Sequence, residues 1–455
     1  MKLISLAGAF TVPDGVQSTG SGTLPSAFDV TGLAVASLAA AGEAVADLVE
    51  HLGGARPAAT VDRSLASLWF GLSFAPVGWE LPPVWDALAG DYVCADGWIR
   101  LHTNAPHHRA AALAVLGIPD TAVVSRDTVA AAVRGWTGEE LEGAVVAANG
   151  CAALMRTHAA WLRHPQGAAV AAEPLVAWGS WRSVPEYRGR GVGVAGERGT
   201  PQRPLAGVRV LDLTRVIAGP VATRFLASLG AQVLRIDPPW WSEPAIEAEM
   251  TVGKHCARLD LRTPEGLAAL HRLLGTADIL IHGYRSDALE RLGLGEAALA
   301  ARYPWLAAVG LDAYGWTGPW AHRRGFDSLV QMSCGISHAG MAYFGSLAPH
   351  PLPVQALDHA TGYLAAAAAV EAWTDRLLGR VRSARLSLAR TAVDLLSTAG
   401  SAPGSTPDRS EHPGLAESTA WGPGTRLPPA LALSGLDFRF DVPAHGYGSA
   451  EPEWH

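Results

Sequence analysis

The stretch GVRVLDLTRVIAGPVATRFLASLGAQVLRID, residues 207–237, decides the fold class of this 455-residue chain. Residues Gly207 to Leu213 form a short apolar run that is typical of a buried parallel strand. The Gly219-Pro220 turn follows, and a proline in the first helical turn favours a helix that runs through Leu229. Gln232 to Asp237 then supplies a second strand, so the stretch predicts a complete βαβ unit.

The alternation of strands and helices continues toward the C-terminus. Thr263-Pro264-Glu265 combines a capping threonine with a proline and predicts a helix to Leu274. Two further apolar runs, residues 277–281 and Leu306 to Leu311, predict strands. The expected fold class is therefore α/β, with an open, Rossmann-like, largely parallel sheet covered by helices. In such a sheet, ligands bind beyond the carboxyl ends of the strands.

The composition excludes several classes of protein. Apolar residues make up 49% of the chain and charged residues 17%, which is typical of a globular protein, and the length predicts two or three packed units. The net charge of −7 provides no basic field for nucleic acid or an anionic membrane surface. No apolar run reaches the roughly 18 residues that a membrane-spanning helix needs. We therefore expect neither nucleic acid nor a membrane as a partner.

The cysteines and the first residues bear on the cellular compartment. The four cysteines lie far apart and have no zinc-site spacing, so we expect reduced thiols and no metal. Met1 to Val12 resembles a weak signal peptide but lacks a persuasive cleavage site. The expected location is cytoplasmic.

Composition also divides the chain. Residues 179–203 are rich in Gly, Arg and Pro without apolar periodicity and predict an interdomain linker. The linker contains Gly191-x-Gly193-x-x-Gly196, which matches a dinucleotide-binding fingerprint but has no strand before it, so we interpret it as linker. The sequence predicts four parts: 1–178, a partial N-terminal copy with a helical stretch and a small α+β domain; 179–203, the linker; 204–399, the large domain; and 400–455, a Gly/Pro-rich C-terminal extension.

An internal repeat links the two halves. Asp29-Val-Thr31-Gly32 opens an Ala-rich helical stretch that leads to Ser64-Leu65. Asp358-His-Ala-Thr361-Gly362 opens another, which leads to Ser387-Leu388. We expect the same structural module to occur twice, although a chance similarity of Ala-rich helices is an alternative explanation.

Six segments in a fixed order carry a resemblance to a known family. They are PLAGVRVLDLTRVIAGP (204–220), LGAQVLRIDPP (229–239), GKHCARLDLRTPEG (253–266), ADILIHGYRSDALERLGLG (277–295), YGWTGPWAHRRGFD (314–327) and QALDHATGYLAAAAA (355–369). From Pro204 to about Leu396 the chain resembles the large domain of the family III CoA-transferases, a superfamily that also includes α-methylacyl-CoA racemase. Residues 90–104 and 161–166 are similar to parts of the family's small domain, so the domain order resembles a permuted or fused arrangement.

The resemblance implies a catalytic residue and a reaction. Asp327 stands where the family has its nucleophilic aspartate, which implies transfer of CoA from an acyl-CoA thioester to a carboxylic acid through an aspartyl anhydride and an aspartyl-CoA thioester. The oxyanion that forms needs hydrogen-bond donors, which we expect from backbone N–H groups near Gly335 or from another loop. The family also implies a homodimer and no permanently bound cofactor, because CoA is a substrate.

The resemblance further implies a set of CoA contacts. The turn Arg215-Val216-Ile217-Ala218 is expected to wrap the nucleotide with its backbone amides. Lys254, one of only two lysines in the chain, matches a family lysine that reaches CoA. Arg291 matches another contact, and Tyr284 and Arg285 lie on the intervening loop. Four tryptophans near this predicted site fit an apolar acyl group, namely Trp240, Trp241, Trp316 and Trp320.

Two alternatives to the transferase stay open. Racemases of this superfamily carry a histidine immediately before the aspartate, and that histidine moves a proton at the α-carbon. Here Phe326 occupies that position, which disfavours racemisation unless His322 or His338 substitutes. The other alternative is a CoA-binding homologue that has lost catalysis.

Overall fold

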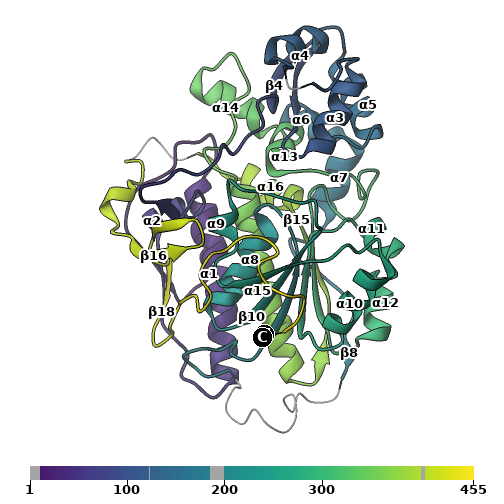
Figure 1. The fold of residues 1–455 in the computed structure, drawn as a ribbon. Helices are drawn as coiled ribbons and strands as arrows, with labels where there is room; N and C mark the ends of the chain where they lie inside the picture. The colour runs from purple at the N-terminus through teal and green to yellow at the C-terminus, as the bar shows by residue number, and fades with distance from the viewer. Residues whose placement is uncertain (1–10, 122, 185–198, 401–404, 455) are drawn as a thin grey trace.

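A seven-stranded sheet forms the centre of the computed structural model, which describes residues 11–121, 123–184, 199–400 and 405–454. The strand order is β11-β10-β9-β12-β13-β15-β7 (Figure 1). The first six strands are parallel, and the edge strand β7 runs antiparallel to β15. The strands span Arg209–Leu213 (β9), Gln232–Asp237 (β10), Lys254–Arg258 (β11), Ile279–His282 (β12), Ala307–Asp312 (β13), Ala384–Ser387 (β15) and Ala177–Trp178 (β7).

The order of the parallel strands identifies the fold. Counted from β9 along the chain, the six strands lie in the order 3-2-1-4-5-6, which is the Rossmann arrangement. The predicted βαβ unit is formed by β9, α8 (Ala218–Ser228) and β10. Gly219 is required in α8 because a Cβ there would lie 2.2 Å from the Cβ of Thr214. The predicted α/β fold class is confirmed.

Helices cover both faces of the sheet. On one face lie α8 and the long helix α15 (Ala356–Leu377), and on the other lie α10 (Pro264–Leu274), α11 (Ser286–Arg291) and α12 (Glu296–Arg302) (Figure 1). Successive residues of β9 serve the two faces, since Val210 belongs to one hydrophobic core and Leu211 to the other. This two-sided burial explains the continuous apolar run that predicted the strand.

A small domain lies above the carboxyl ends of the strands, at the top of Figure 1. It contains an antiparallel three-stranded sheet of β4 (Gly90–Cys94), β5 (Gly97–Leu101) and β6 (Ala152–Leu154). Helices α3 (Pro106–Val115), α4 (Arg126–Val133) and α5 (Gly138–Ala147) pack against this sheet around their own core. The α+β character predicted for this domain is therefore present in the N-terminal half.

The predicted repeat appears as two modules that pack together. Helix α1 (Val30–His51), strand β2 (Ala59–Asp62) and helix α2 (Arg63–Trp69) have the same order as α15, β15 and α16 (Leu388–Leu396). Helices α1 and α15 lie against each other. A buried hydroxyl pair ties each long helix to the short one, with Thr31 to Ser67 at 2.8 Å and Thr361 to Thr391 at 2.7 Å. Helix α1 is long and apolar enough to span a membrane, but 83% of its most apolar window is buried in this packing.

The C-terminal segment joins elements of the N-terminal half. Strands β16 (Leu415–Thr419) and β17 (Gly422–Arg426) form a sheet with β3 (Phe74–Pro76), and β18 (Leu431–Leu433) pairs with β2, which also pairs with β1 (Val16–Thr19). Elements from both sides of the predicted boundaries at 178 and 400 thus share sheets, and the division into domains stays a prediction. The Gly191-x-Gly193-x-x-Gly196 motif lies outside the described residues.

The remaining elements are short connections around this framework. They are α6 (His158–Arg163), α7 (Pro165–Ala172), β8 (Arg182–Ser183), α9 (Glu247–Met250), α13 (Asp327–Cys334), α14 (Ile336–Phe344), β14 (Arg380–Val381) and the 3-10 turn η1 (Arg409–Glu411). Helix α13 matters most for function, because it begins at the predicted nucleophile and packs against β6 of the small domain.

Candidate active site

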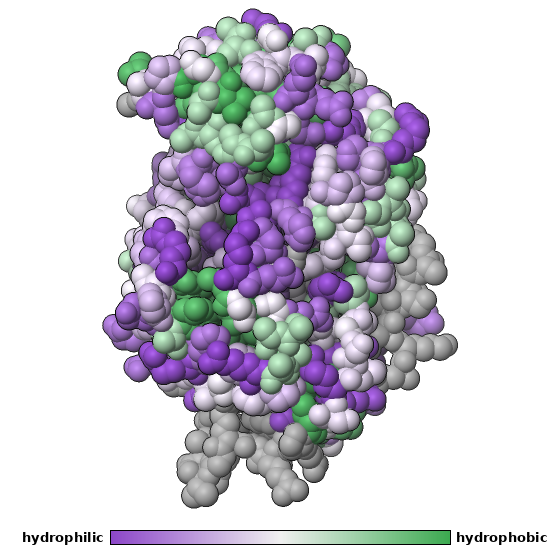
Figure 2. Space-filling model, turned by 90° about the vertical axis from the view of Figure 1, so that its right-hand side faces the viewer, coloured by the Kyte–Doolittle hydropathy of each residue, from purple (hydrophilic) through white to green (hydrophobic). Residues whose placement is uncertain are grey.

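A cavity of about 470 Å³ opens at the carboxyl ends of β9, β12 and β13. Its walls come from the loops after these strands and from the small domain. Strand β10 follows β9 in the chain and pairs with one edge of it, whereas β12 pairs with the other edge. The strand order therefore reverses between β9 and β12, and such a switch point is where α/β sheets bind ligands. Figure 2 shows that the surface beneath the small domain is hollowed and strongly hydrophilic.

The cavity is strongly cationic. Five arginines line it, namely Arg215, Arg285, Arg291, Arg323 and Arg324. Two carboxyls, Asp312 and Asp358, also line it, and burial raises the pKa of each well above the usual range. Burial thus shifts both carboxyls toward their neutral form, which offsets the positive charge of the arginines less than two carboxylates would. Such a cavity suits a polyanion.

Six of the eight predicted binding residues line this cavity. They are Arg215, Val216, Ala218, Tyr284, Arg285 and Arg291. The Arg215 guanidinium lies 4.5 Å from the ring centre of Trp241 and 5.3 Å from that of Tyr284. Arg291, whose side chain is 65% exposed, pairs with Asp287 at 2.9 Å. The structure thus brings together residues from the loops after β9 and β12.

The turn between β9 and α8 is strained at one residue. Val216 has a φ of 65°, a left-handed conformation that a β-branched residue rarely adopts. Its N–H donates to Glu243 Oε1 at 2.9 Å. Backbone strain of this kind concentrates at functional sites. The neighbouring Ile217 does not line the cavity, because its side chain packs against the hydrophobic core.

Lys254 does not line the cavity either. It is fully buried, and its Nζ lies 3.2 Å from Asp212 Oδ2 and donates to the Pro220 carbonyl at 3.0 Å. Burial lowers the pKa of Lys254 to about 8. The Asp212 carboxylate also accepts hydrogen bonds from the Thr214 and Thr223 hydroxyls. In this structure Lys254 therefore holds the first turn of α8 against β9, and its direct contact with CoA stays a prediction.

The predicted nucleophile Asp327 lies directly behind the cavity wall. Its neighbours Phe326 and Asp358 line the cavity, whereas Asp327 is only 1% exposed. Its Oδ1 accepts from Gln331 Nε2 at 2.5 Å, and its Oδ2 accepts from the backbone N–H of Asp358 at 2.9 Å. Burial raises the pKa of Asp327 to about 6. This carboxylate is weakly solvated and is held by donors on α13 and α15.

The oxyanion donors, expected from backbone N–H groups near Gly335 or from another loop, stay a prediction. Asp327 is the first residue of α13 and Gly335 follows its last, so about 12 Å of helix separates them. A Cβ at Gly335 would lie 2.3 Å from the His158 nitrogen, which shows that this glycine permits contact with the small domain. The backbone N–H groups that donate to the Asp327 carboxylate itself belong to the first turn of α15.

The small domain contributes histidines that sequence analysis missed. The rings of His102 and Phe326 stack with their centres 3.7 Å apart, and His107 and His108 line the cavity. Burial lowers the pKa of His102 and of His108 to about 3, so both imidazoles are neutral at physiological pH. More than 200 residues separate them from Phe326, so no local spacing could reveal them.

The histidines singled out by sequence lie elsewhere, and so do two tryptophans. His322 and His338 are exposed and do not line the cavity. Trp240 and Trp241 do line it. Trp316 and Trp320 do not, since Trp316 donates to the Leu386 carbonyl and Trp320 packs against Trp161 and Tyr314. The missed arginines Arg323 and Arg324 had a local signal, because they immediately precede Gly325-Phe326-Asp327.

Comparisons with known proteins agree with the six sequence segments. Residues 205–421 match CoA-transferase family III. A succinyl-CoA:glutarate CoA-transferase of Mus musculus is 33% identical over 175 residues, which cover 33% of this chain and 40% of that protein. A probable fatty acyl-CoA transferase of Mycobacterium tuberculosis is 33% identical over 191 residues, or 39% of this chain and 48% of that protein. The chain thus spans less than half the length of these relatives.

A comparison with solved structures covers a similar share of the chain. A crystal structure of a hypothetical protein from Mycobacterium tuberculosis aligns with a TM-score of 0.39 and 32% identity, over 43% of this chain and 57% of that one. The sequence match includes the loops that follow β9 and β12, the arginines beside them and Asp327. The resemblance seen in the sequence is confirmed, since residues 205–421 match CoA-transferase family III.

Proposed function

We propose that this protein transfers CoA from an acyl-CoA thioester to a carboxylic acid, with Asp327 as the nucleophile. One observation carries the proposal: a buried carboxyl lies directly behind the wall of a cavity lined by five arginines. The arginines suit the phosphates of CoA, and the carboxyl suits attack on a thioester. Trp240 and Trp241 offer apolar surface to the acyl group.

The reaction would proceed through covalent intermediates on Asp327. Its carboxylate attacks the thioester carbonyl, the C–S bond breaks, and CoA leaves as a thiolate. The acyl group and the Asp327 carboxylate are then joined in a mixed anhydride. The thiolate then attacks the Asp327 carbonyl and releases the first carboxylate, which leaves an aspartyl-CoA thioester. The acceptor carboxylate then attacks the aspartyl-CoA thioester and displaces the CoA thiolate, which gives a second mixed anhydride. The thiolate attacks the acceptor's acyl carbonyl in this anhydride, which releases the new acyl-CoA and restores the Asp327 carboxylate. Because Asp327 is 1% exposed, the attack requires this side chain to turn toward the cavity.

Further parts of the proposal concern cofactors, assembly and location. CoA and acyl-CoA act as substrates, and no cofactor is permanently bound. The proposed assembly is a homodimer, and the proposed location is the cytoplasm. Within one chain, α1 packs on α15, which forms an interface between the N-terminal module and the C-terminal module of the repeat.

The pH dependence of the first step tests the state of Asp327. Its pKa of about 6 means that the nucleophilic carboxylate is lost as the pH falls through 6. We expect the rate of intermediate formation to level off above pH 7 and to fall about tenfold per pH unit below 6. Rapid-quench kinetics with an acyl-CoA donor would measure this profile. A rate that stays constant down to pH 4.5 would contradict the assignment.

Replacing Arg215 tests the proposed CoA site. The variant Arg215→Ala removes a cation from the cavity wall and should weaken CoA binding by about 1–3 kcal/mol, measured by calorimetry, with a smaller effect on kcat. Lys254→Met is the matched control, because this cation lies beneath the cavity. We expect Lys254→Met to lower stability while the folded protein keeps most of its affinity. The opposite pattern would restore Lys254 as the CoA contact.

An acyl-CoA racemase is the second candidate, because His102 and His108 lie against Phe326. Racemisation needs a base that removes the α-proton, whereas CoA transfer leaves the α C–H bond intact. An imidazole with a pKa of about 3 is a weak base, which favours the transferase.

Isotope exchange separates the candidate functions. We expect a 2-methylacyl-CoA incubated with the protein in deuterated water to gain no α-deuterium. Adding a carboxylate acceptor should generate a new thioester, seen by mass spectrometry. Deuterium that enters without an acceptor, and that is lost in His108→Phe, would put the racemase first. CoA binding without either reaction would identify a homologue that has lost catalysis.

A further inference from the structure

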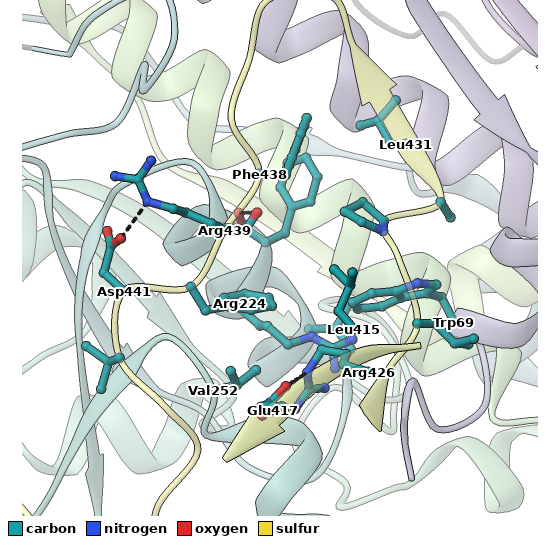
Figure 3. A pocket seen from close by; sticks show the side chains of 18 of the residues that line it. Trp69, Arg224, Val252, Leu415, Glu417, Arg426, Leu431, Phe438, Arg439 and Asp441 are labelled. Atoms are coloured by element: carbon teal, nitrogen blue, oxygen red, sulfur yellow. Dashed lines mark hydrogen bonds and ion pairs between the residues drawn. The ribbon is translucent and has the colours of Figure 1, made fainter. Parts of the chain in front are cut away.

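A second cavity, of about 540 Å³, lies between α8, the N-terminal module and the C-terminal segment (Figure 3). Its volume is within the range of about 300–1,000 Å³ that is typical of small-molecule sites. One face of α8 contributes Val221, Arg224, Phe225 and Ser228, which recur at helical spacing. Among the described residues, none lines both this cavity and the arginine-lined one. The two cavities are therefore separate sites.

The walls of this second cavity are mainly apolar and aromatic. Trp69 of α2, Tyr363 of α15, Leu431 of β18 and Phe438 of the C-terminal segment come from four parts of the chain. Figure 3 shows the labelled side chains Trp69, Leu431 and Phe438 around the space, with Leu415 beside Trp69. The exposed pair Arg439 and Asp441, joined at 3.0 Å, contributes to the lining. The body of a ligand here must be apolar.

Buried charges on one side of the cavity balance one another. Arg224 forms an ion pair with Glu249, and Arg426 pairs with Glu249 at 3.2 Å and with Glu417 at 2.5 Å. Two cations thus face two carboxylates. Glu249 stays ionised at neutral pH, because the guanidinium groups of Arg224 and Arg426 hold the pKa of its carboxyl at about 2. A ligand that brought a net charge would leave this group unbalanced in an apolar setting.

One donor in this group is unsatisfied. Arg224 is 2% exposed, its guanidinium lies 4.8 Å from the Trp69 ring centre, and its side chain interacts with the Tyr363 hydroxyl. Its Nη2 nevertheless has no hydrogen-bond partner of good geometry among the described residues. A buried donor without a partner costs free energy, which one acceptor atom on a ligand would recover.

We propose that this cavity binds a small, neutral, mainly apolar molecule with one hydrogen-bond acceptor, such as a ketone or an ester, whose oxygen accepts from Arg224. The apolar walls favour an apolar ligand body, and the Arg224 Nη2 donor favours a ligand with a hydrogen-bond acceptor. The balanced charges beside the cavity disfavour a ligand that carries a carboxylate. The proposal uses no property of the arginine-lined cavity, so its test is independent of the proposed CoA transfer.

The neutral fluorescent ketone prodan is the probe that tests this site, with the full-length protein. We expect one prodan per chain, bound with blue-shifted emission. Ala416→Trp places an indole in the cavity from an exposed strand position and should weaken binding at least about tenfold. Ala420→Trp, on the same strand-turn segment but outside the lining, should leave affinity unchanged within about twofold. Ser418→Trp is the second filling variant if Ala416→Trp does not fold.

Competition identifies the class of ligand. We expect 2-decanone to displace prodan at a concentration at least about tenfold lower than decanoate, because only the ketone is neutral. The proposal is overturned if prodan does not bind, if it binds both filling variants as tightly as the wild type, or if decanoate competes better than 2-decanone. A CoA-transferase assay of the same variants would report separately on the other cavity.

Discussion

Asp327→Asn is expected to abolish CoA transfer and covalent modification, while the protein stays folded. The amide keeps the shape of the side chain but cannot attack a thioester, so kcat should fall by about 10³-fold or more. Incubation with an acyl-CoA and then borohydride or hydroxylamine should label the wild type at Asp327 and leave the variant unlabelled. Peptide mass spectrometry would locate the label.

Asp312→Asn is the matched control for this result. Asp312 is also a buried carboxyl with a raised pKa, and it lines the same cavity. Because burial favours the neutral form of Asp312, its amide replacement is a conservative change, and labelling at Asp327 should persist. Labelling that continues in Asp327→Asn would move the nucleophile to another residue and remove the basis of the proposed mechanism.

Glu249→Gln is expected to cause the largest loss of stability. Its carboxylate is 2% exposed and pairs with Arg224 and Arg426, and it accepts hydrogen bonds from the Ser73 hydroxyl at 2.7 Å and from the Phe74 N–H at 2.9 Å. Neutralising it leaves two buried guanidinium groups short of a partner, which typically costs about 3–5 kcal/mol. Urea unfolding would measure the change. Glu265→Gln, at an exposed position in α10, should cost less than about 1 kcal/mol.

The same network predicts a dependence of stability on pH. The folded-state pKa of Glu249 is about 2, below its ordinary value of 4.5. The stabilisation is therefore complete above pH 4.5 and is lost as the pH falls toward 2. We expect the difference in unfolding free energy between wild type and Glu249→Gln to shrink over that interval. A difference that stays constant from pH 7 to pH 3 would show that charge is not its source.

Local sequence determined the fold class and half of the site. The apolar run of β9, the proline in the first turn of α8 and the strand β10 follow one another closely, so periodicity alone predicts a βαβ unit. The family resemblance predicted that Arg215, Tyr284 and Arg285 share a site, and the structure brings them together because β9 and β12 are adjacent parallel strands. The motif that ends in Asp327 likewise lies within one loop.

Only the tertiary structure decided which residues distant in sequence line that cavity and which predicted residues do not. His108 reaches the cavity because the small domain docks on α13, a contact between segments more than 200 residues apart. Lys254 on β11 turns away from the cavity because its ammonium pairs with Asp212 on β9, two strands away in the sheet, and both side chains are fully buried. Cavities, ion pairs and pKa shifts depend on which surfaces exclude solvent together, and this property belongs to the packed chain rather than to any stretch of its sequence.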